Sequence, residues 1–179
     1  MRRILLLDDD PAVLNALLRN FRQITSREPL QMEVFTDPYE ALNRVAEKAF
    51  DLIISDFHMP DMNGVDFLVE VKRIQPSCIR MMLSAALDPG TLLAAINQAE
   101  ALRYIPKPWD VEDLQEAYNL ACRRHDEMLE EHRLADERRL EKGDLTPQEV
   151  ALRRLEEEEP GITKVHWGAD GSVLLNATD

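Results

Sequence analysis

Between residues 1 and 122, a short apolar run is followed five times by a segment with helical periodicity. The central apolar runs are unbroken, as in strands that helices cover on both faces. This alternation predicts an α/β fold, in which a doubly wound five-stranded parallel sheet is flanked by helices. The expected strands are Arg3–Leu7, Met32–Phe35, Leu52–Ser55, Ile79–Leu83 and Leu102–Ile105, and the expected helices are Pro11–Ile24, Tyr39–Lys48, Val65–Ile74, Thr91–Ala99 and one that begins near Val111.

Aspartates mark the starts of several of these helices. An N-cap acid followed by proline at the first helical position is a strong start signal. The pairs at 10–11, 37–38 and 88–89 have this form, and a further aspartate precedes the fifth helix. We therefore expect helix caps at Asp10, Asp37, Asp88 and Asp110, which leaves Asp8 and Asp9 of the first acidic group free for another role.

Four of the predicted strands run directly into polar residues. Asp8 and Asp9 follow the first, Asp56 the third, Ser84 the fourth and Lys107 the fifth. In an open parallel sheet all carboxyl ends lie along one edge, where ligands bind. The pattern therefore brings carboxylates, a hydroxyl and an ammonium into one crevice. This set suits a hard divalent cation and a phosphoryl group.

The composition limits the function classes. The 179 residues suffice for one domain and an appendage, and a net charge of −13 disfavours binding to nucleic acid. No apolar stretch reaches membrane-spanning length, and the run that ends at Leu7 is too short for a signal peptide, so we expect a soluble, cytoplasmic protein without membrane contact. Cys78 and Cys122 fit buried reduced thiols, with a disulfide or redox pair as the alternative.

The C-terminal third differs from the alternating part. The fifth helix is expected to continue to about Glu141, with a weak apolar seam that fits either a paired helix or a solvated single one. A capping box at Thr146–Glu149 opens a short helix to about Glu158. Two strands, at 162–165 and 172–175, would then form a hairpin that docks on its own domain or on a partner.

Four segments together resemble the receiver domain of two-component response regulators, a CheY-like fold. They are residues 4–11, 51–64, 81–85 and 103–108, which lie in order at the ends of the first, third, fourth and fifth strands. The resemblance implies the strand order 2-1-3-4-5 of flavodoxin-like folds. It also implies a receiver domain at 1–122. The periodicity and turn signals described above add an extension of the fifth helix at 123–142 and a helix and hairpin tail at 143–179. The Lys107-Pro108-Trp109 segment is similar to receivers that precede larger output domains.

The resemblance also assigns roles to individual residues. Asp9 and Asp56 would bind Mg²⁺ directly, Asp8 mainly through water, and the His58 backbone carbonyl would complete the protein ligands. Asp56 would be the nucleophile, while Lys107 and Ser84 would contact the phosphoryl oxygens. Ser84 and Tyr104 would form the switch, and Lys107-Pro108 would be cis. The plainer alternatives are a loop acid for Asp56, a surface lysine for Lys107, a strand-end serine for Ser84 and a half-buried strand residue for Tyr104.

The expected function follows from these roles. A sensor histidine kinase or phosphotransfer protein would phosphorylate Asp56, and the signal would pass through a homodimer formed by the fourth and fifth helices or through a downstream protein target. DNA binding through a small effector, or service as a phosphate sink, are alternatives, while turnover of an outside substrate is not expected. His58 and Ala86 occupy positions that tune dephosphorylation in the family. His125, His132 and His166 are expected to be solvated or packed.

Overall fold

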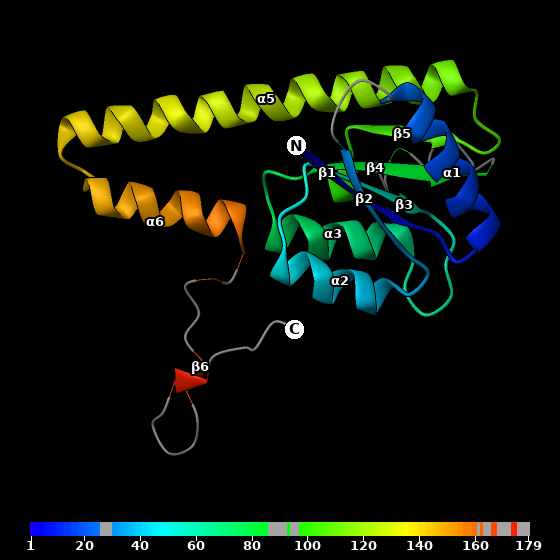
Figure 1. Ribbon diagram of the computed structural model, residues 1–179, viewed down its shortest axis with the longest axis horizontal. Helices are drawn as coiled ribbons and strands as arrows, with labels where there is room; N and C mark the ends of the chain where they lie inside the picture. The colour runs from blue at the N-terminus through cyan, green and yellow to red at the C-terminus, as the bar shows by residue number, and fades with distance from the viewer. Residues whose placement is uncertain are drawn as a thin grey trace.

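The computed structural model describes residues 1–25, 30–85, 93, 97–160, 162, 166–167 and 173–174. Five strands form one parallel sheet in the order β2-β1-β3-β4-β5, which confirms the predicted fold (Figure 1). Strand boundaries differ from the prediction by two residues at most, and the last strand begins one residue later than expected. The strands are β1 (Arg2–Leu7), β2 (Leu30–Phe35), β3 (Leu52–Asp56), β4 (Ile79–Ser84) and β5 (Arg103–Pro106).

Helices cover both faces of the sheet. α2 (Pro38–Glu47) and α3 (Gly64–Ile74) lie beneath it in Figure 1, whereas α1 (Pro11–Ile24) and α5 (Val111–Lys142) cover the opposite face. Of the helix predicted at 91–99, positions 93 and 97–99 are described and are helical. Ala86 and the cap predicted at Asp88 lie outside the described residues.

Two of the predicted aspartate caps are confirmed by hydrogen bonds. The Asp10 carboxylate accepts from the Ala12 N–H at 2.8 Å, and Asp37 accepts from the Tyr39 N–H at 2.7 Å. Asp110 occupies the N-cap of α5, but its side chain makes no capping hydrogen bond. Because Asp10 is used as a cap, only its two predecessors remain for the sheet edge.

Alternating strand residues build two apolar layers. Ile4, Leu6 and Ile54 pack with residues of α1 and α5, while Leu5 and Ile53 pack with residues of α2 and α3. This two-sided burial is the physical reason that the central strands read as continuous apolar runs.

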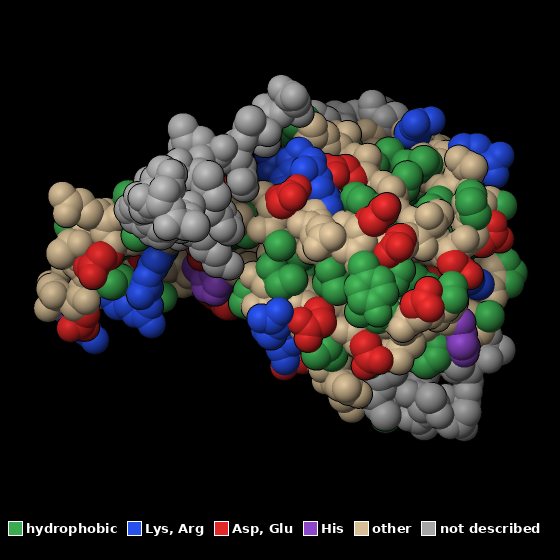
Figure 2. Space-filling model, turned by 90° about the horizontal axis from the view of Figure 1, so that it is seen from below, with side chains coloured by type: hydrophobic (Ala, Val, Ile, Leu, Met, Phe, Trp, Pro, Cys, Tyr) green, Lys and Arg blue, Asp and Glu red, His purple; other side chains and the backbone are tan. Residues whose placement is uncertain are grey.

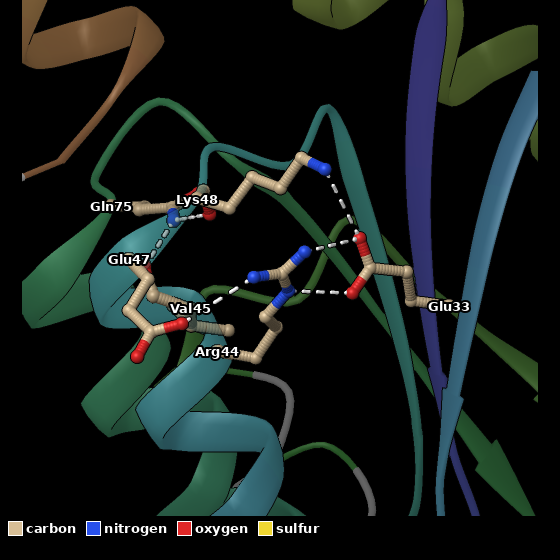
Figure 3. A network of polar contacts seen from close by, with 6 residues as sticks. All are labelled: Glu33, Arg44, Val45, Glu47, Lys48 and Gln75. Atoms are coloured by element: carbon tan, nitrogen blue, oxygen red, sulfur yellow. Dashed lines mark hydrogen bonds and ion pairs between the residues drawn. The ribbon is translucent and has the colours of Figure 1, made fainter. Parts of the chain in front are cut away.

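A buried glutamine and an ion-pair network fix the end of α2 (Figure 3). The Gln75 side chain donates to the carbonyls of Val45 at 2.5 Å and Lys48 at 2.6 Å, and accepts from the Phe50 N–H at 2.9 Å. Arg44 meanwhile makes a bidentate contact to Glu33 on β2. The amide thus satisfies backbone groups that the end of a helix leaves without partners.

The long helix α5 continues to Lys142 and ends at Gly143, which has a left-handed φ of 76°. Its first half packs on the sheet. After Gly143 the chain turns into α6 (Pro147–Glu158), which begins with the predicted capping box and runs back beneath the second half of α5 (Figure 1). Asp136 lies 3.4 Å from Arg153, and His132 lies 3.6 Å from Glu157. These two ion pairs join the second half of α5 to α6 within the chain, while Leu129 and Leu134 of α5 stay exposed.

The predicted hairpin is present, but its first strand was misplaced. β6 (His166–Trp167) pairs antiparallel with β7 (Val173–Leu174), whereas the prediction put the first strand at 162–165. Ile162 lies in a turn, because the chain has only just left α6. Residues 163–165 lie outside the described part. Within the described part, none of the helices is both long and apolar enough to cross a membrane.

Candidate functional site

The predicted site residues from four strands meet at the carboxyl edge of the sheet. Asp8 and Asp9 follow β1, Asp56 ends β3, Ser84 ends β4 and Lys107 follows β5. The parallel pairing aligns these ends, since Asp56 is in register with Leu83 and Ser84 with Pro106. The topology thus converts residues 99 positions apart, Asp8 and Lys107, into direct neighbours.

Three carboxylates and one ammonium form the centre of the site. Carboxylate oxygens of Asp8, Asp9 and Asp56 lie within 4.8 Å of one another. Asp8 and Asp56 are 1% and 5% exposed, whereas Asp9 faces solvent. The Lys107 Nζ lies 2.6 Å from Asp8 and 2.5 Å from Asp56. This lysine therefore contacts both buried carboxylates, and its single positive charge offsets part of the cost of burying them.

The protonation behaviour of the site reflects the crowding of charge. Burial raises the pKa of Asp8, although hydrogen bonds from Lys107 and from the Asp10 N–H oppose the shift. Burial works against the charge of Lys107, but the hydrogen bonds to Asp56 and Asp8 prevail and raise its pKa. The ammonium is therefore held in its charged form beside both carboxylates.

Backbone groups orient the Asp56 side chain. The His58 N–H donates to Asp56 Oδ2 at 2.9 Å, and the His58 ring packs edge-on against Phe57 with centroids 4.6 Å apart. Gly64, at the start of α3, lies against the Asp56 carbonyl: a Cβ added there would come within 2.0 Å of that oxygen. Sequence reasoning did not assign this glycine a role. Its place in the motif, eight residues after Asp56, was the available signal.

Ser84 and Tyr104 lie on the neighbouring strands. Ser84 is buried, and its hydroxyl donates to the Ala85 carbonyl at 2.6 Å. Its own carbonyl accepts from the Lys107 N–H at 2.8 Å, which ties β4 to the lysine. Tyr104 lies on β5 with 43% of its surface exposed. The Lys107-Pro108 bond is cis, as expected.

The remaining cysteines and histidines lie elsewhere. Both cysteines are free, and burial raises the pKa of the Cys78 thiol. His125 is buried at the opposite edge of the sheet, and His132 faces α6. The side chain of His166 is not described. The alternative prediction of a disulfide between Cys78 and Cys122 is therefore wrong for this structure.

The oxygen-rich cluster fits a hard divalent cation. Ligands of one octahedral Mg²⁺ at about 2.1 Å are separated by at most about 4.2 Å, which is compatible with the observed spread once the side chains adjust. Carboxylates are the preferred ligands of such an ion, and few are needed because the rest of the shell is water. Asp8, Asp9 and Asp56 thus meet the requirement in kind and position.

Comparison with known proteins identifies the family. Residues 4–119 match the response regulator receiver domain. Over 115 residues the chain is 33% identical to the transcriptional regulatory protein ZraR of Klebsiella oxytoca, covering 63% of this chain and 24% of the relative. Over 113 residues it is 34% identical to the DNA-binding transcriptional regulator NtrC of Azospirillum brasilense, covering 62% and 22%. The chain thus spans about a quarter of the length of these curated relatives.

Solved structures agree. The signal receiver domain of an HD domain-containing protein from Pseudomonas fluorescens Pf-5 matches with a TM-score of 0.63 and 32% identity, over 72% of this chain and 92% of that one. An adenylate cyclase structure from Rhodopirellula baltica matches with a TM-score of 0.68 and 28% identity, over 75% and 97%. The family match, the sheet order and the aspartate–lysine cluster lead to one conclusion: the chain belongs to the response regulator receiver domains.

Proposed function

We propose that this chain accepts a phosphoryl group on Asp56 from a sensor histidine kinase or a phosphotransfer protein, in the cytoplasm. The observation that carries the proposal is the buried Asp56 carboxylate held 2.5 Å from the Lys107 ammonium, beside two further aspartates. In the transfer, the P–N bond of a phosphohistidine breaks while a P–O bond to Asp56 forms, which leaves a neutral imidazole on the donor after protonation. The product on this chain is a mixed anhydride.

The neighbouring side chains have complementary tasks. A phosphoryl group in transfer spreads negative charge over three equatorial oxygens. Lys107 is positioned to take one of them, and the Ser84 hydroxyl can take another by rotating away from the Ala85 carbonyl. The His58 N–H holds the carboxylate in place before the transfer. These groups act by positioning and electrostatic stabilisation rather than by acid–base chemistry.

Mg²⁺ is the cofactor that the acidic cluster suits. Asp9 and Asp56 would hold it directly, Asp8 mainly through water, and the His58 carbonyl would supply a further oxygen. When bound, the ion neutralises charge on the transferred group and on the crowded carboxylates. In the metal-free protein Lys107 pairs with both Asp8 and Asp56, so we expect it to move toward the phosphoryl group when the ion binds.

Mass spectrometry of the protein after incubation with acetyl phosphate and Mg²⁺ tests the proposal. We expect one added phosphoryl group, located on Asp56. Asp56→Asn should abolish the labelling, whereas Asp61→Asn should leave it unchanged. Asp61 is an exposed loop acid with a φ of 67°, a backbone conformation that asparagine also tolerates. Undiminished labelling of Asp56→Asn contradicts the proposal.

We further propose that residues 1–122 are the receiver and that residues 123–142 and 143–179 carry its output. Phosphorylation would turn Ser84 and exposed Tyr104 inward and change dimerisation through the fourth and fifth helices, or docking onto a protein target. Reversing a 1:99 population requires about 5.5 kcal/mol of preference for one state. Light scattering with and without beryllofluoride gives the molar mass and so tests dimerisation. The same mass in both conditions would leave docking onto a protein target as the output.

DNA binding is the second candidate, because the curated relatives include DNA-binding regulators. The net charge of −13 opposes it for this segment. Electrophoretic shift assays at several salt concentrations decide between the two outputs: salt-sensitive binding to duplex DNA by the phosphorylated chain would favour this candidate.

A further inference from the structure

One side of α6 is occupied by contacts within the chain. Val150 is buried, and the side chains of Arg153 and Glu157 contact α5 at 3.4 and 3.6 Å. These three positions follow a spacing of three and four, so they share one side of the helix. Arg153 and Glu157 also line a cavity of about 670 Å³ that α6 closes over the amino edge of the sheet, beside His125. This inner side of α6 therefore faces α5 and the receiver (Figure 1).

The opposite side of α6 carries two exposed leucines. Leu152 and Leu155 each come two residues after a member of the inner side, and two residues turn an α-helix by about 200°. They are 52% and 48% exposed, and their spacing of three makes them neighbours on the helix surface. A single exposed leucine is ordinary, whereas two adjacent ones form a continuous apolar surface on a helix whose other side is already packed. We call Leu152 and Leu155 the leucine pair.

The charge around the leucine pair has one sign. On a helix, the surface neighbours of a residue lie three and four positions away. For the leucine pair these positions hold glutamates at 149, 156, 158 and 159 and neither lysine nor arginine. Hydrogen bonds from the N–H and the hydroxyl of Thr146 lower the pKa of Glu149, so its carboxylate is charged at neutral pH. Both arginines of α6 line the cavity, as do Glu156 and Glu159 at its boundary with the outer side. The leucine pair thus has an acidic border.

We propose that the leucine pair docks onto a basic amphipathic helix of a partner protein. The leucines would pack on the apolar stripe of that helix, and the glutamates would face lysines or arginines beside the stripe. A second copy that offered the same side of α6 would set glutamates against glutamates, so the charge selects a different protein. The proposal gives a place to the docking output of residues 143–179, and it rests on the proposed function only for the link to phosphorylation.

Two other exposed apolar positions serve as matched controls. Leu134 of α5 is 40% exposed, but it stands alone, and its neighbours Glu130 and Glu137 are already paired with Arg133. Acidic side chains are also spread over the face formed by α2 and α3, with basic ones at its margins (Figure 2). Tyr39, at the start of α2, is 52% exposed. Because a cationic probe can be attracted to any acidic surface, these positions report binding away from α6.

The test is a fluorescence anisotropy titration of the full chain against a labelled synthetic peptide of leucine and lysine, about four helical turns long, with its leucines at a spacing of three and four. We expect saturable binding that weakens as salt is added. The double variant Leu152→Gln, Leu155→Gln should weaken binding about tenfold through lost apolar contact. Glutamine is a good helix former and both positions are half-exposed, so this variant is expected to fold, which circular dichroism checks.

Leu134→Gln and Tyr39→Gln should each change the affinity by less than about twofold. A peptide of the same composition in scrambled order keeps the charge but loses the apolar stripe, and it should bind about tenfold more weakly. Three results would overturn the proposal: equal losses in the double variant and in a control, equal binding of the ordered and scrambled peptides, or a dimer of this chain in sedimentation that the double variant dissociates. Each of these outcomes leaves the labelling of Asp56 untouched, because none of the substitutions lies in the aspartate cluster.

Discussion

Replacement of Gly64 by alanine tests whether α3 positions the phosphorylation site. The added methyl group would lie 2.0 Å from the Asp56 carbonyl oxygen and 2.9 Å from its carbon, and contacts below 3.0 Å are essentially never seen for real Cβ atoms. The start of α3 and the end of β3 must therefore separate by about 1 Å or more. Both partners are backbone, so no side-chain rotation relieves the clash.

The magnitude follows from three contributions. Overpacking in a close-packed region costs about 1–3 kcal/mol. The Gly64 N–H donates to the Phe57 carbonyl at 3.0 Å, and stretching this bond beyond hydrogen-bond range costs about 1 kcal/mol more. Alanine restricts the unfolded chain, which offsets about 0.4–1 kcal/mol. We therefore expect Gly64→Ala to lower the free energy of unfolding by about 2 kcal/mol.

Function should fall more steeply than stability. A displacement of about 1 Å of a reacting group can slow a reaction about 100-fold. Urea unfolding gives the stability, and the initial rate of Asp56 labelling by acetyl phosphate gives the function, measured where the variant is fully folded. Gly143→Ala is the control, because its cost of about 1–2 kcal/mol comes from a left-handed backbone without any clash. A Gly64→Ala protein that labels at the wild-type rate would refute the positioning role of this contact.

The other predictions concern single groups. Lys107→Met should lower the stability of the metal-free protein by about 3 kcal/mol, because it leaves two buried carboxylates unpaired, and Mg²⁺ should restore much of the loss in thermal unfolding. Gln75→Ala should cost about 3 kcal/mol in urea unfolding, because three buried backbone groups lose their partner, whereas exposed Gln115→Ala should be nearly neutral. Because the pKa of Asp8 is raised, the Asp8 carboxyl of the folded, metal-free protein stays protonated at pH values above 3.8, the ordinary pKa of an aspartate. The free energy of unfolding of the metal-free protein should therefore decline as pH rises from 3.8 through the raised pKa. Mg²⁺ affinity, measured by calorimetry, should conversely decline as pH falls through the same interval, and a flat profile would contradict the assignment of Asp8.

Sequence reasoning performed best where local patterns carry the information. Asp10 and Asp37 have the cap geometry that their Asp-Pro pairs predicted, and the Thr146–Glu149 capping box is formed. The two-sided burial of β1, β3 and β4 is likewise what unbroken apolar runs predict. These features depend on neighbours close in sequence or on the simple alternation of strand faces.

Reasoning from the sequence was weaker where partners are distant. The first hairpin strand was placed too early, because short apolar segments do not fix their own register and β6 is defined by its pairing with β7. The seam of α5 left pairing and solvation equally open, and the ion pairs that join α5 to α6 could not be foreseen from the seam. The cap that Gln75 provides for α2 was not foreseen, because it joins residues about 25–30 positions apart.

The order of residues alone determined that this chain is an α/β domain with acidic, hydroxyl and ammonium groups at its strand ends. Hydrophobic periodicity and the residues that cap or end helices and strands are local properties of a chain. Only the tertiary structure decided which of those groups touch: that Lys107 bridges Asp8 and Asp56, that Gly64 abuts the Asp56 carbonyl, and that α6 closes a cavity over His125. Such contacts depend on sheet order and helix return, which bring together residues that sequence separation keeps apart.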